Sequence, residues 1–413
     1  MFNPPPESEL SDRSVELLST HLQGKRVALL ITGSIAAMKA PLIARCLRRR
    51  GADVVAFASA EALRYTTIDT LEWSTINPVV SKLTAAAEHL SARDPFAAYL
   101  VAPATYNTIN KMRFGIADGI ITAALGSAIG RMERGKTKIL IAPTMHGSLH
   151  NSILTESLHH LHEMGVKIIA PRVANGKNNL PDEKAIATEV CRAVSSSPLK
   201  DVPILVTGGP TPVPIDNIRR LTNRFTGRLG ACIAEELYLR GAKVQLIHGQ
   251  GTYTPPDYIP YHLISTYDEY RQKVIAQLNL DRYPVAIFSA AVADYQSDRV
   301  FLGKIPSNGA LQNLKLIPTQ KVIAEVRHRF PDLHMVIFKY QDNVSYAKLI
   351  SIAQARLQQG YQMVVANRGE ETSLEREQVA YLLTRDRPPQ KAIGKQQIAI
   401  AIADYLSKLN LKS

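Results

Sequence analysis

The sequence is poor in cysteine and in long hydrophobic runs, and each shortage excludes a class of protein. Its 413 residues include three cysteines, Cys46, Cys191 and Cys232, which are too few and too far apart for a disulfide framework or a CxxC metal site. No apolar run approaches the roughly 20 residues of a membrane span, and residues 1–14 lack the profile of a signal peptide. We therefore expect a cytoplasmic protein without membrane contact, whose cysteines are buried as small apolar residues.

The chain also lacks a concentrated basic segment, although it is basic overall. Its formal net charge is +13, and its lysines and arginines are spread along the sequence without accompanying aromatic residues. Proteins that bind nucleic acid usually gather such residues on one patch or helix. We expect no nucleic-acid partner; phosphorylated small molecules are the expected ligands, because positive potential raises their local concentration.

Two segments begin with the same pattern. Residues 24–58 read as a strand, a glycine turn, an amphipathic helix and a second strand, and residues 202–249 repeat this plan with an insertion before the helix. Two βαβ-type starts predict two α/β domains. The predicted divisions are an N-terminal extension (1–23), a first domain (24–193), a Ser- and Pro-containing linker (194–201) and a second domain (202–413).

The apolar runs of both halves are continuous and end in polar loops. Residues 97–105, 137–145 and 284–295 are examples. Such runs favour parallel sheets buried on both faces, so the predicted fold class is α/β with two Rossmann-like doubly wound domains. Ligands of these sheets bind beyond the carboxyl ends of the strands. The tail, 398–411, is predicted to be an amphipathic helix that packs in the core.

The first strand ends in TGSIAA, residues 32–37. Gly33 permits a tight turn, Ser34 supplies a hydroxyl, and the amides at the start of the following helix attract anions. The motif by itself is equally consistent with phosphate binding and with plain architecture, because every α/β protein needs a turn there.

The segments TGSIAAMKA, FASAEALRY, VAPATYNTINKMRFGIADGIIT and IAPTMHGSLHN follow one another in residues 24–192. In this order they resemble the flavin-dependent cysteine decarboxylases. The resemblance implies an FMN cofactor that oxidises a cysteine side chain, loss of carbon dioxide, and return of the hydride to the enethiol. It also implies trimer-based homo-oligomers. The implied site has phosphate ligands (Thr32, Gly33, Ser34 and Ser59), residues near the flavin ring (Thr105 and Asn107), a catalytic histidine (His89) and substrate residues (Met145, His146 and Asn175).

Two of these positions depart from the family pattern. His146 stands where the family has the asparagine that holds the substrate carboxylate, and Asn175, in ANGKNNLPDE, stands where it has the cysteine that reprotonates the enethiolate. Histidine can still bind a carboxylate, but an asparagine amide cannot donate a proton at neutral pH. His150, Lys177 or a water are the alternative donors. A ligase whose first half serves only for oligomerisation is therefore an alternative.

The second half contains LVTGGPTPVPIDNIRRLTNRFTGRLG, then SAAVADY and GKI. A Gly-Gly-Pro turn after a strand exposes backbone amides to an anionic ligand. Together these segments, from residue 202 to VVANRGEE, resemble phosphopantothenoylcysteine ligases. The resemblance implies that a nucleoside triphosphate with Mg²⁺ activates the 4′-phosphopantothenate carboxylate as an acyl nucleotide, which the cysteine amine attacks. The implied residues are Asn223 for the acyl nucleotide, Lys304 for the transferring phosphate, and Gly208, Ser289, Ala290, Asp294 and Phe338 for the nucleotide.

Some lysines of the bacterial bifunctional ligases are missing here. The chain has KIPS, PTQK and ARLQQGYQ, with Ala355 and Gln359 near the expected lysines. The choice between CTP and ATP therefore stays open. A regulatory protein that binds these ligands without turnover is a further alternative, but the two resemblances together predict an enzyme of the bifunctional coenzyme A biosynthesis type.

Overall fold

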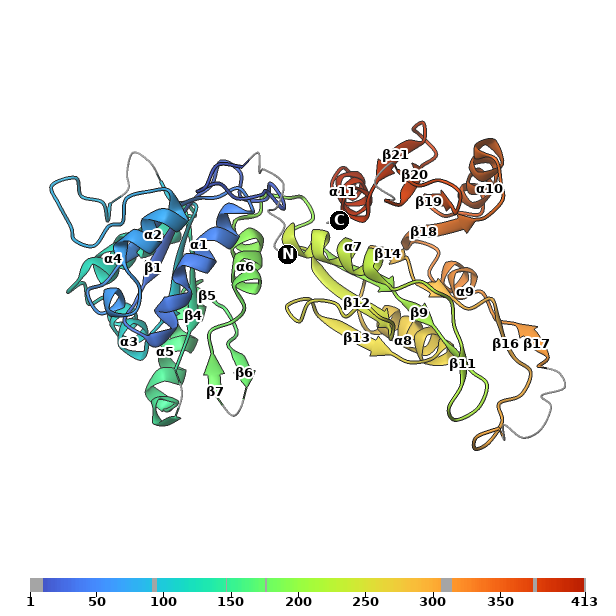
Figure 1. Ribbon diagram of the computed structural model, residues 1–413, viewed down its shortest axis with the longest axis horizontal. Coiled ribbons are helices and arrows are strands. Elements are labelled where there is room, and N and C mark those ends of the chain that lie inside the picture. The colour runs from blue at the N-terminus through green and yellow to red at the C-terminus, as the bar shows by residue number, and fades with distance from the viewer. Residues whose placement is uncertain are drawn as a thin grey trace, which may run out of the picture. The chain divides into compact units, whose positions relative to one another are not determined.

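The computed structural model describes residues 10–90, 95–145, 147–174, 177–305, 314–373 and 377–411 (Figure 1). The chain divides into two compact units, 1–196 and 197–413. The predicted linker at 194–201 spans this division. His146 and Asn175, both predicted to bind substrate, lie outside the described residues.

The first unit contains a five-stranded parallel sheet with the order β2-β1-β3-β4-β5. The strands at residues 26–31, 98–104 and 138–143 are almost entirely buried, as the continuous apolar runs predicted. The strands are β1 (Arg26–Ile31), β2 (Asp53–Ala58), β3 (Ala98–Ala104), β4 (Lys138–Pro143) and β5 (Lys167–Ile168), and a separate hairpin is formed by β6 (Arg172–Ala174) and β7 (Lys177–Asn179). The helices are η1 (Ile35–Lys39), α1 (Ala40–Arg48), η2 (Ala62–Arg64), α2 (Ile68–Thr75), α3 (Tyr106–Arg113), α4 (Ile120–Glu133), η3 (Gly147–Leu149), α5 (Ser152–Glu163) and α6 (Glu183–Val194).

The second unit contains an eight-stranded sheet with the order β13-β12-β8-β14-β18-β19-β20-β21. The first six strands are parallel and follow the 3-2-1-4-5-6 order of dinucleotide-binding folds, whereas β20 and β21 are antiparallel. The strands are β8 (Pro203–Gly208), β12 (Lys243–Gly249), β13 (Tyr261–Ile264), β14 (Val285–Phe288), β18 (His334–Gln341), β19 (Met363–Arg368), β20 (Val379–Leu383) and β21 (Gln390–Ile393). The two sheets confirm the predicted fold class.

Short strand pairs and helices surround this sheet. The pairs are β9 (Pro210–Thr211) with β15 (Ala291–Val292), β10 (Val213–Pro214) with β11 (Arg220–Leu221), and β16 (Tyr295–Ser297) with β17 (Leu316–Pro318). The helices are α7 (Arg228–Leu239), α8 (Tyr267–Leu280), α9 (Val322–Arg329), α10 (Tyr346–Gln358) and α11 (Lys395–Leu406).

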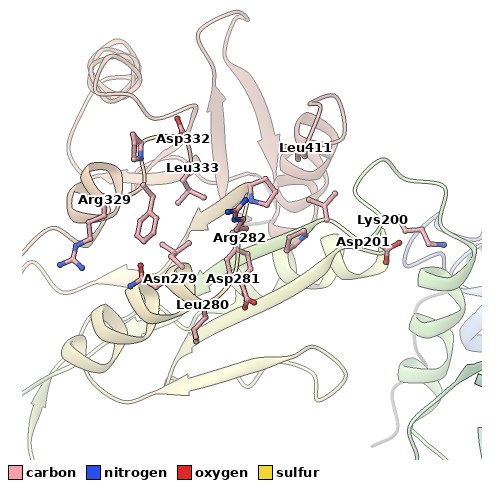
Figure 2. Close-up of a pocket in the computed structure, with 17 residues that line it drawn as sticks. Lys200, Asp201, Asn279, Leu280, Asp281, Arg282, Arg329, Asp332, Leu333 and Leu411 are labelled. Atoms are coloured by element: carbon pink, nitrogen blue, oxygen red, sulfur yellow. The ribbon is translucent and has the colours of Figure 1, made fainter. Parts of the chain in front are cut away.

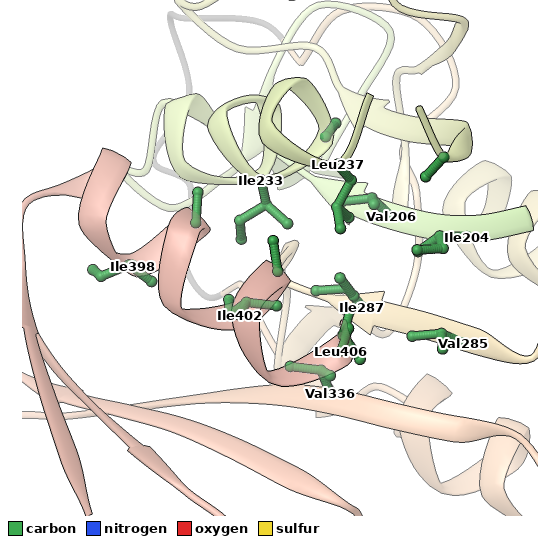
Figure 3. Packing of buried hydrophobic residues seen from close by; sticks show 14 of the residues in the cluster. Ile204, Val206, Ile233, Leu237, Val285, Ile287, Val336, Ile398, Ile402 and Leu406 are labelled. Atoms are coloured by element: carbon green, nitrogen blue, oxygen red, sulfur yellow. The ribbon is translucent and has the colours of Figure 1, made fainter. Parts of the chain in front are cut away.

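Helix α11 packs against α7 and one face of this sheet (Figure 3). Ile398, Ile402 and Leu406 are spaced four residues apart, so they lie on one face of the helix, and each is fully buried. They meet Ile233 and Leu237 of α7 in the same cluster. The predicted core role of the C-terminal tail is confirmed.

The cysteine prediction is right for one residue and wrong for two. Cys191 is buried, but Cys46 on α1 and Cys232 on α7 are only partly buried. Both lie beside the buried stripe of their helix and not within it, which leaves part of each side chain exposed. Within the described part of the chain, no helix combines the length and the apolar character needed to cross a bilayer.

Candidate functional site

The carboxyl ends of four neighbouring strands carry predicted site residues of the first unit. Ser59 follows β2, Thr32 and Ser34 follow β1, Thr105 follows β3, and Met145 follows β4. The sheet grows from β1 toward β2 on one side and toward β3 on the other, so the gap between β1 and β3 is a topological switch point. The fold therefore brings these residues to the edge where such sheets bind ligands.

Ser34 and Ser59 present hydroxyls at helix starts. The Oγ of Ser34 accepts a hydrogen bond of 3.3 Å from Ala36 N in η1, and the Oγ of Ser59 accepts one of 3.2 Å from Ala62 N in η2. A hydroxyl that accepts from the backbone keeps its own proton for donation. Both side chains can therefore donate to an anionic ligand.

Thr32 and Gly33 have structural roles at the same turn. Thr32 is 3% exposed, and its Oγ1 donates to Pro103 O across 2.7 Å, which ties the end of β1 to β3. A Cβ added to Gly33 would lie 2.4 Å from the Cβ of Glu61. The Thr32 hydroxyl is committed to the protein, so these two residues offer their backbone to a ligand.

Thr105 caps the helix that follows β3. Its Oγ1 accepts a hydrogen bond of 3.4 Å from Thr108 N and lies 3.0 Å from Thr108 Oγ1. Asn107, within the first turn of α3, is exposed. The start of α3 thus adds a capped helix end and an exposed amide to the edge.

His89 lies in the loop between α2 and β3 and is partly buried. Its Nδ1 is buried and has no hydrogen-bond partner among the described residues. A buried, unsatisfied ring nitrogen is unfavourable, so this atom is available to a ligand or a water.

The β6–β7 hairpin reaches the end of β4 through His150. Met145 is 5% exposed and forms an isolated bridge with Asn178 of β7. The Nε2 of His150 lies 3.0 Å from Met145 O and 3.3 Å from Asn178 Nδ2. A titratable side chain therefore joins the loop after β4 to the hairpin that bears the predicted position 175.

In the second unit, the turn after β8 approaches helix α7 closely. Gly209, next to the predicted nucleotide residue Gly208, has a φ of +78°, and a Cβ there would lie 2.5 Å from Gly249 O. Gly227 caps α7 with a φ of +87°, and its Cβ would lie 2.7 Å from Gly209 Cα. Only glycine allows this backbone approach. The turn and the α7 start lie at the switch point between β8 and β14.

Ser289 and Ala290 follow β14 and are fastened to β8. The Ser289 Oγ donates to Thr207 O across 2.6 Å, and Ala290 N donates to Thr207 Oγ1 across 3.3 Å. Ser289 N also donates to Thr207 O across 3.2 Å, so the serine hydroxyl and both backbone N–H groups are used to hold this segment against β8.

Asn223 links the two signature segments of the second half. Its Nδ2 donates to Ala291 O across 2.7 Å, and its Oδ1 accepts from Phe225 N across 3.2 Å. Ala291 N in turn donates to Gly209 O across 2.9 Å. The Gly-Gly-Pro turn, the Asn223 loop and the SAAVADY segment therefore meet in one hydrogen-bonded group.

The remaining predicted residues differ in their surroundings. Lys304 is exposed, and Asp294 is exposed and paired with Lys321. Phe338 on β18 is partly buried against the cluster that α7 and α11 form, so only part of its ring is accessible. The pair with Lys321 places Asp294 beside the start of α9, because Lys321 is the N-cap residue of that helix.

Sequence reasoning missed two charged residues near this edge. Asp216 is 4% exposed and accepts a hydrogen bond from Ile305 of the GKI segment; its position in the motif IDNIRR could have pointed to it. Lys339, on β18, is partly buried; burial lowers the pKa of its ammonium group, and the charge of Arg356 lowers it further. Lys339 directly follows the predicted nucleotide residue Phe338 in FKYQD, but the sequence analysis gave it no role.

A pocket of about 1150 Å³ lies at the opposite edge of the second sheet (Figure 2). Its lining includes Pro203, Pro284 and Leu333, which stand at the amino ends of β8, β14 and β18. None of the predicted site residues that the structure describes lines it. It is therefore separate from the edge at which the motifs gather.

Two family models match the chain, one for each unit. The flavoprotein model matches residues 16–195, and the model of the DNA/pantothenate metabolism flavoprotein C-terminal domain matches residues 199–409.

Curated relatives match nearly the whole length of the chain. The coenzyme A biosynthesis bifunctional protein CoaBC of Thermococcus kodakarensis is 33% identical and covers 95% of this chain and 97% of its own. The protein of the same name from Methanocaldococcus jannaschii is 29% identical and covers 94% of each. Among solved structures, the DNA/pantothenate metabolism flavoprotein from Streptococcus pneumoniae is 26% identical, covers 50% of this chain and 98% of its own, and has a TM-score of 0.45.

Two α/β units, consecutive in the sequence, carry the motifs at their strand ends, and a third of the residues are shared with a curated protein over almost the full length of both chains; the chain belongs to the family of bifunctional coenzyme A biosynthesis proteins.

Proposed function

We propose that the second unit joins 4′-phosphopantothenate to cysteine at the expense of a nucleoside triphosphate. The observation that supports this most is the hydrogen bond from Asn223 Nδ2 to Ala291 O, 2.7 Å long, which unites the two ligase signatures at the switch point of the sheet. Asn223 holds the acyl nucleotide, and Gly208, Ser289 and Ala290 line the nucleotide.

Three charged residues, Lys304, Asp294 and Lys339, have different roles toward the nucleotide. Lys304, exposed at the edge, stabilises the charge that develops on the transferring phosphate, and Asp294 binds the nucleotide. Mg²⁺ bridges the triphosphate oxygens. Phe338 packs beside the base with the accessible part of its ring. Lys339 supplies a positive charge to the triphosphate in place of the missing family lysines, for either CTP or ATP.

Replacing Lys304 by alanine tests the ligase proposal. With phosphopantothenate, cysteine, Mg²⁺ and nucleotide, we expect pyrophosphate release to slow by about 10²- to 10³-fold, as for the loss of one group that stabilises a transition state. Lys315→Ala is the matched control, since Lys315 is also an exposed lysine of this unit. An unchanged rate in Lys304→Ala contradicts the role of Lys304.

We propose that the first unit binds FMN and decarboxylates phosphopantothenoylcysteine. The hydroxyls of Ser34 and Ser59 and the backbone at Thr32 and Gly33 fit the phosphate, because the two serines keep free protons at helix starts. Bound FMN would supply the oxidation and the returning hydride. Thr105 and Asn107 lie beside the flavin ring. His89 takes part in proton transfer through its Nδ1, which has no hydrogen-bond partner among the described residues.

Two substrate residues of this site are Met145, at the end of β4, and His146, which binds the substrate carboxylate. The acid that reprotonates the enethiolate has to replace the family cysteine, since position 175 is an asparagine. His150 is the described side chain that best fits this task, because it contacts both Met145 and the hairpin.

The first unit also supports self-association. Ile35, Met38 and Leu42 are 65%, 60% and 53% exposed and recur at near-helical spacing along η1 and α1. An exposed apolar stripe of this kind fits a contact between copies of the chain in a trimer-based homo-oligomer. Light scattering of Met38→Glu tests this, with a fall in mass expected and an unchanged mass as the contrary result.

A further inference from the structure

The carboxylate of Asp216 is buried and saturated with hydrogen bonds. Its Oδ1 accepts from the backbone N–H groups of Ile218 and Arg219 across 2.8 and 2.6 Å. Its Oδ2 accepts from Arg219 Nη1 across 2.9 Å and from Ile305 N across 3.0 Å. The side chain has no exposed surface, and four donors offset the cost of burying its charge.

These bonds join two segments that are far apart in the sequence. Three further hydrogen bonds reinforce the junction: Phe301 N donates to Ile215 O across 2.9 Å, Asn217 N donates to Gly303 O across 3.1 Å, and Arg219 Nη1 donates to Ile305 O across 3.2 Å. The backbone on both sides of Lys304 is therefore held, while the Lys304 side chain is exposed.

The same turn also leads to the acyl-nucleotide residue. Asp216 lies between β10 and β11, which pair as a hairpin, and Asn223 follows β11 by two residues. The hairpin that holds the backbone of Lys304 is thus the hairpin that delivers Asn223 to Ala291. The buried carboxylate of Asp216 therefore fixes the position of Lys304 relative to Asn223.

We propose that Asp216 is a positioning residue for acyl-nucleotide formation, which acts by fixing the backbone of Lys304 against the hairpin that leads to Asn223. This rests on the proposed ligase function. Asp216 itself does not touch substrate. Its carboxylate holds the backbone beside Lys304, so the Lys304 side chain is oriented toward the transferring phosphate before the reaction. Such preorganisation raises the rate of the chemical step.

A double-mutant cycle with Asp216→Asn and Lys304→Ala tests the proposal in the full-length protein. The readouts are kcat and the KM for nucleotide in pyrophosphate release with phosphopantothenate, cysteine and Mg²⁺. We expect Asp216→Asn to lower kcat by about 10²-fold, the size of effect that misplacement of a catalytic group can have, with little change in KM. In the Lys304→Ala background the same substitution should lower kcat no further.

Two results would overturn the proposal. One is a wild-type kcat in Asp216→Asn; the other is a double variant in which the two losses multiply, because a residue that acts independently of Lys304 gives additive free energies. If the wild-type protein releases no pyrophosphate, the ligase function fails instead. Asp332→Asn is the control, since Asp332 is an exposed aspartate at the opposite edge of the sheet and should keep the wild-type kcat.

Asp216→Glu is the second variant if Asp216→Asn does not fold. It keeps the charge but moves the carboxylate by one methylene. We expect a folded protein with the wild-type KM and a reduced kcat. In the Lys304→Ala background, Asp216→Glu should again lower kcat no further. A wild-type kcat in Asp216→Glu, or a loss that multiplies with that of Lys304→Ala, contradicts the proposal.

Discussion

The imidazole Nε2 of His150 lies 3.0 Å from the carbonyl oxygen of Met145 and also contacts the amide of Asn178 on the β6–β7 hairpin. This contact is the basis for our proposal that His150 replaces the family cysteine as the proton donor. We predict that His150→Gln, which keeps a hydrogen-bond donor but is no acid, still releases carbon dioxide. Conversion of the enethiol to phosphopantetheine should slow by about 10²- to 10⁴-fold, the usual contribution of a general acid.

Mass spectrometry distinguishes the two products, because the enethiol has two hydrogens fewer than phosphopantetheine. His159→Gln is the matched control; His159 is an exposed histidine of α5 that pairs with Glu163. Equal yields of phosphopantetheine from the wild type and from His150→Gln would show that another group donates the proton.

The buried carboxylate of Asp216 makes the free energy of unfolding of the second unit depend on pH. The backbone N–H of Ile305, helped by those of Arg219 and Ile218, lowers the pKa of Asp216 from 3.8 to about 2, against the opposing effect of burial. Because the folded-state pKa is below the unfolded one, the carboxylate stabilises the fold fully above about pH 4 and loses this contribution as the pH falls toward 2.

The free energy of unfolding, measured in urea from pH 6 to pH 2, checks this dependence. The difference between the wild type and Asp216→Asn should be constant above about pH 4 and shrink below it. A difference that does not change across this range would mean that Asp216 is not held as a carboxylate in the folded protein.

Helix α11 contributes core packing to the second unit, and Ile402 is fully buried at its centre. We predict that Ile402→Ala lowers the free energy of unfolding by about 2–5 kcal/mol, since it removes buried apolar surface and leaves a cavity. Gln397→Ala, an exposed position of the same helix, should change it by less than about 0.5 kcal/mol. Urea denaturation measures both, and equal effects would contradict the packing shown in Figure 3.

The apolar runs were sufficient to predict both parallel sheets and the edge at which the motifs gather. Val27 to Ile31 and Tyr99 to Val101 are continuous apolar runs, and both are buried on the two faces of the sheet, as is typical of central parallel strands. The antiparallel direction of β20 and β21 was not predicted, because a short apolar run does not reveal the direction of its partner. The partial exposure of Cys46 depends on which side of α1 meets the sheet.

Contacts between distant segments were beyond sequence reasoning. Ile305 and Asp216 are 89 positions apart, and only the folded chain shows that one holds the other. The Thr32 hydroxyl is another case, since the motif suggests a phosphate ligand and the fold commits the hydroxyl to Pro103 O. Motifs identify which residue types are present, whereas the hydrogen bonds decide which of their atoms are free.

The most direct test is mass spectrometry of the products formed when the purified protein is incubated with 4′-phosphopantothenate, cysteine, Mg²⁺ and equal amounts of CTP and ATP. Phosphopantetheine, with CMP or AMP to identify the nucleotide, is the expected result, since both units then work in sequence. Phosphopantothenoylcysteine alone would contradict the decarboxylase role of the first unit, and the absence of both products would contradict the whole proposal.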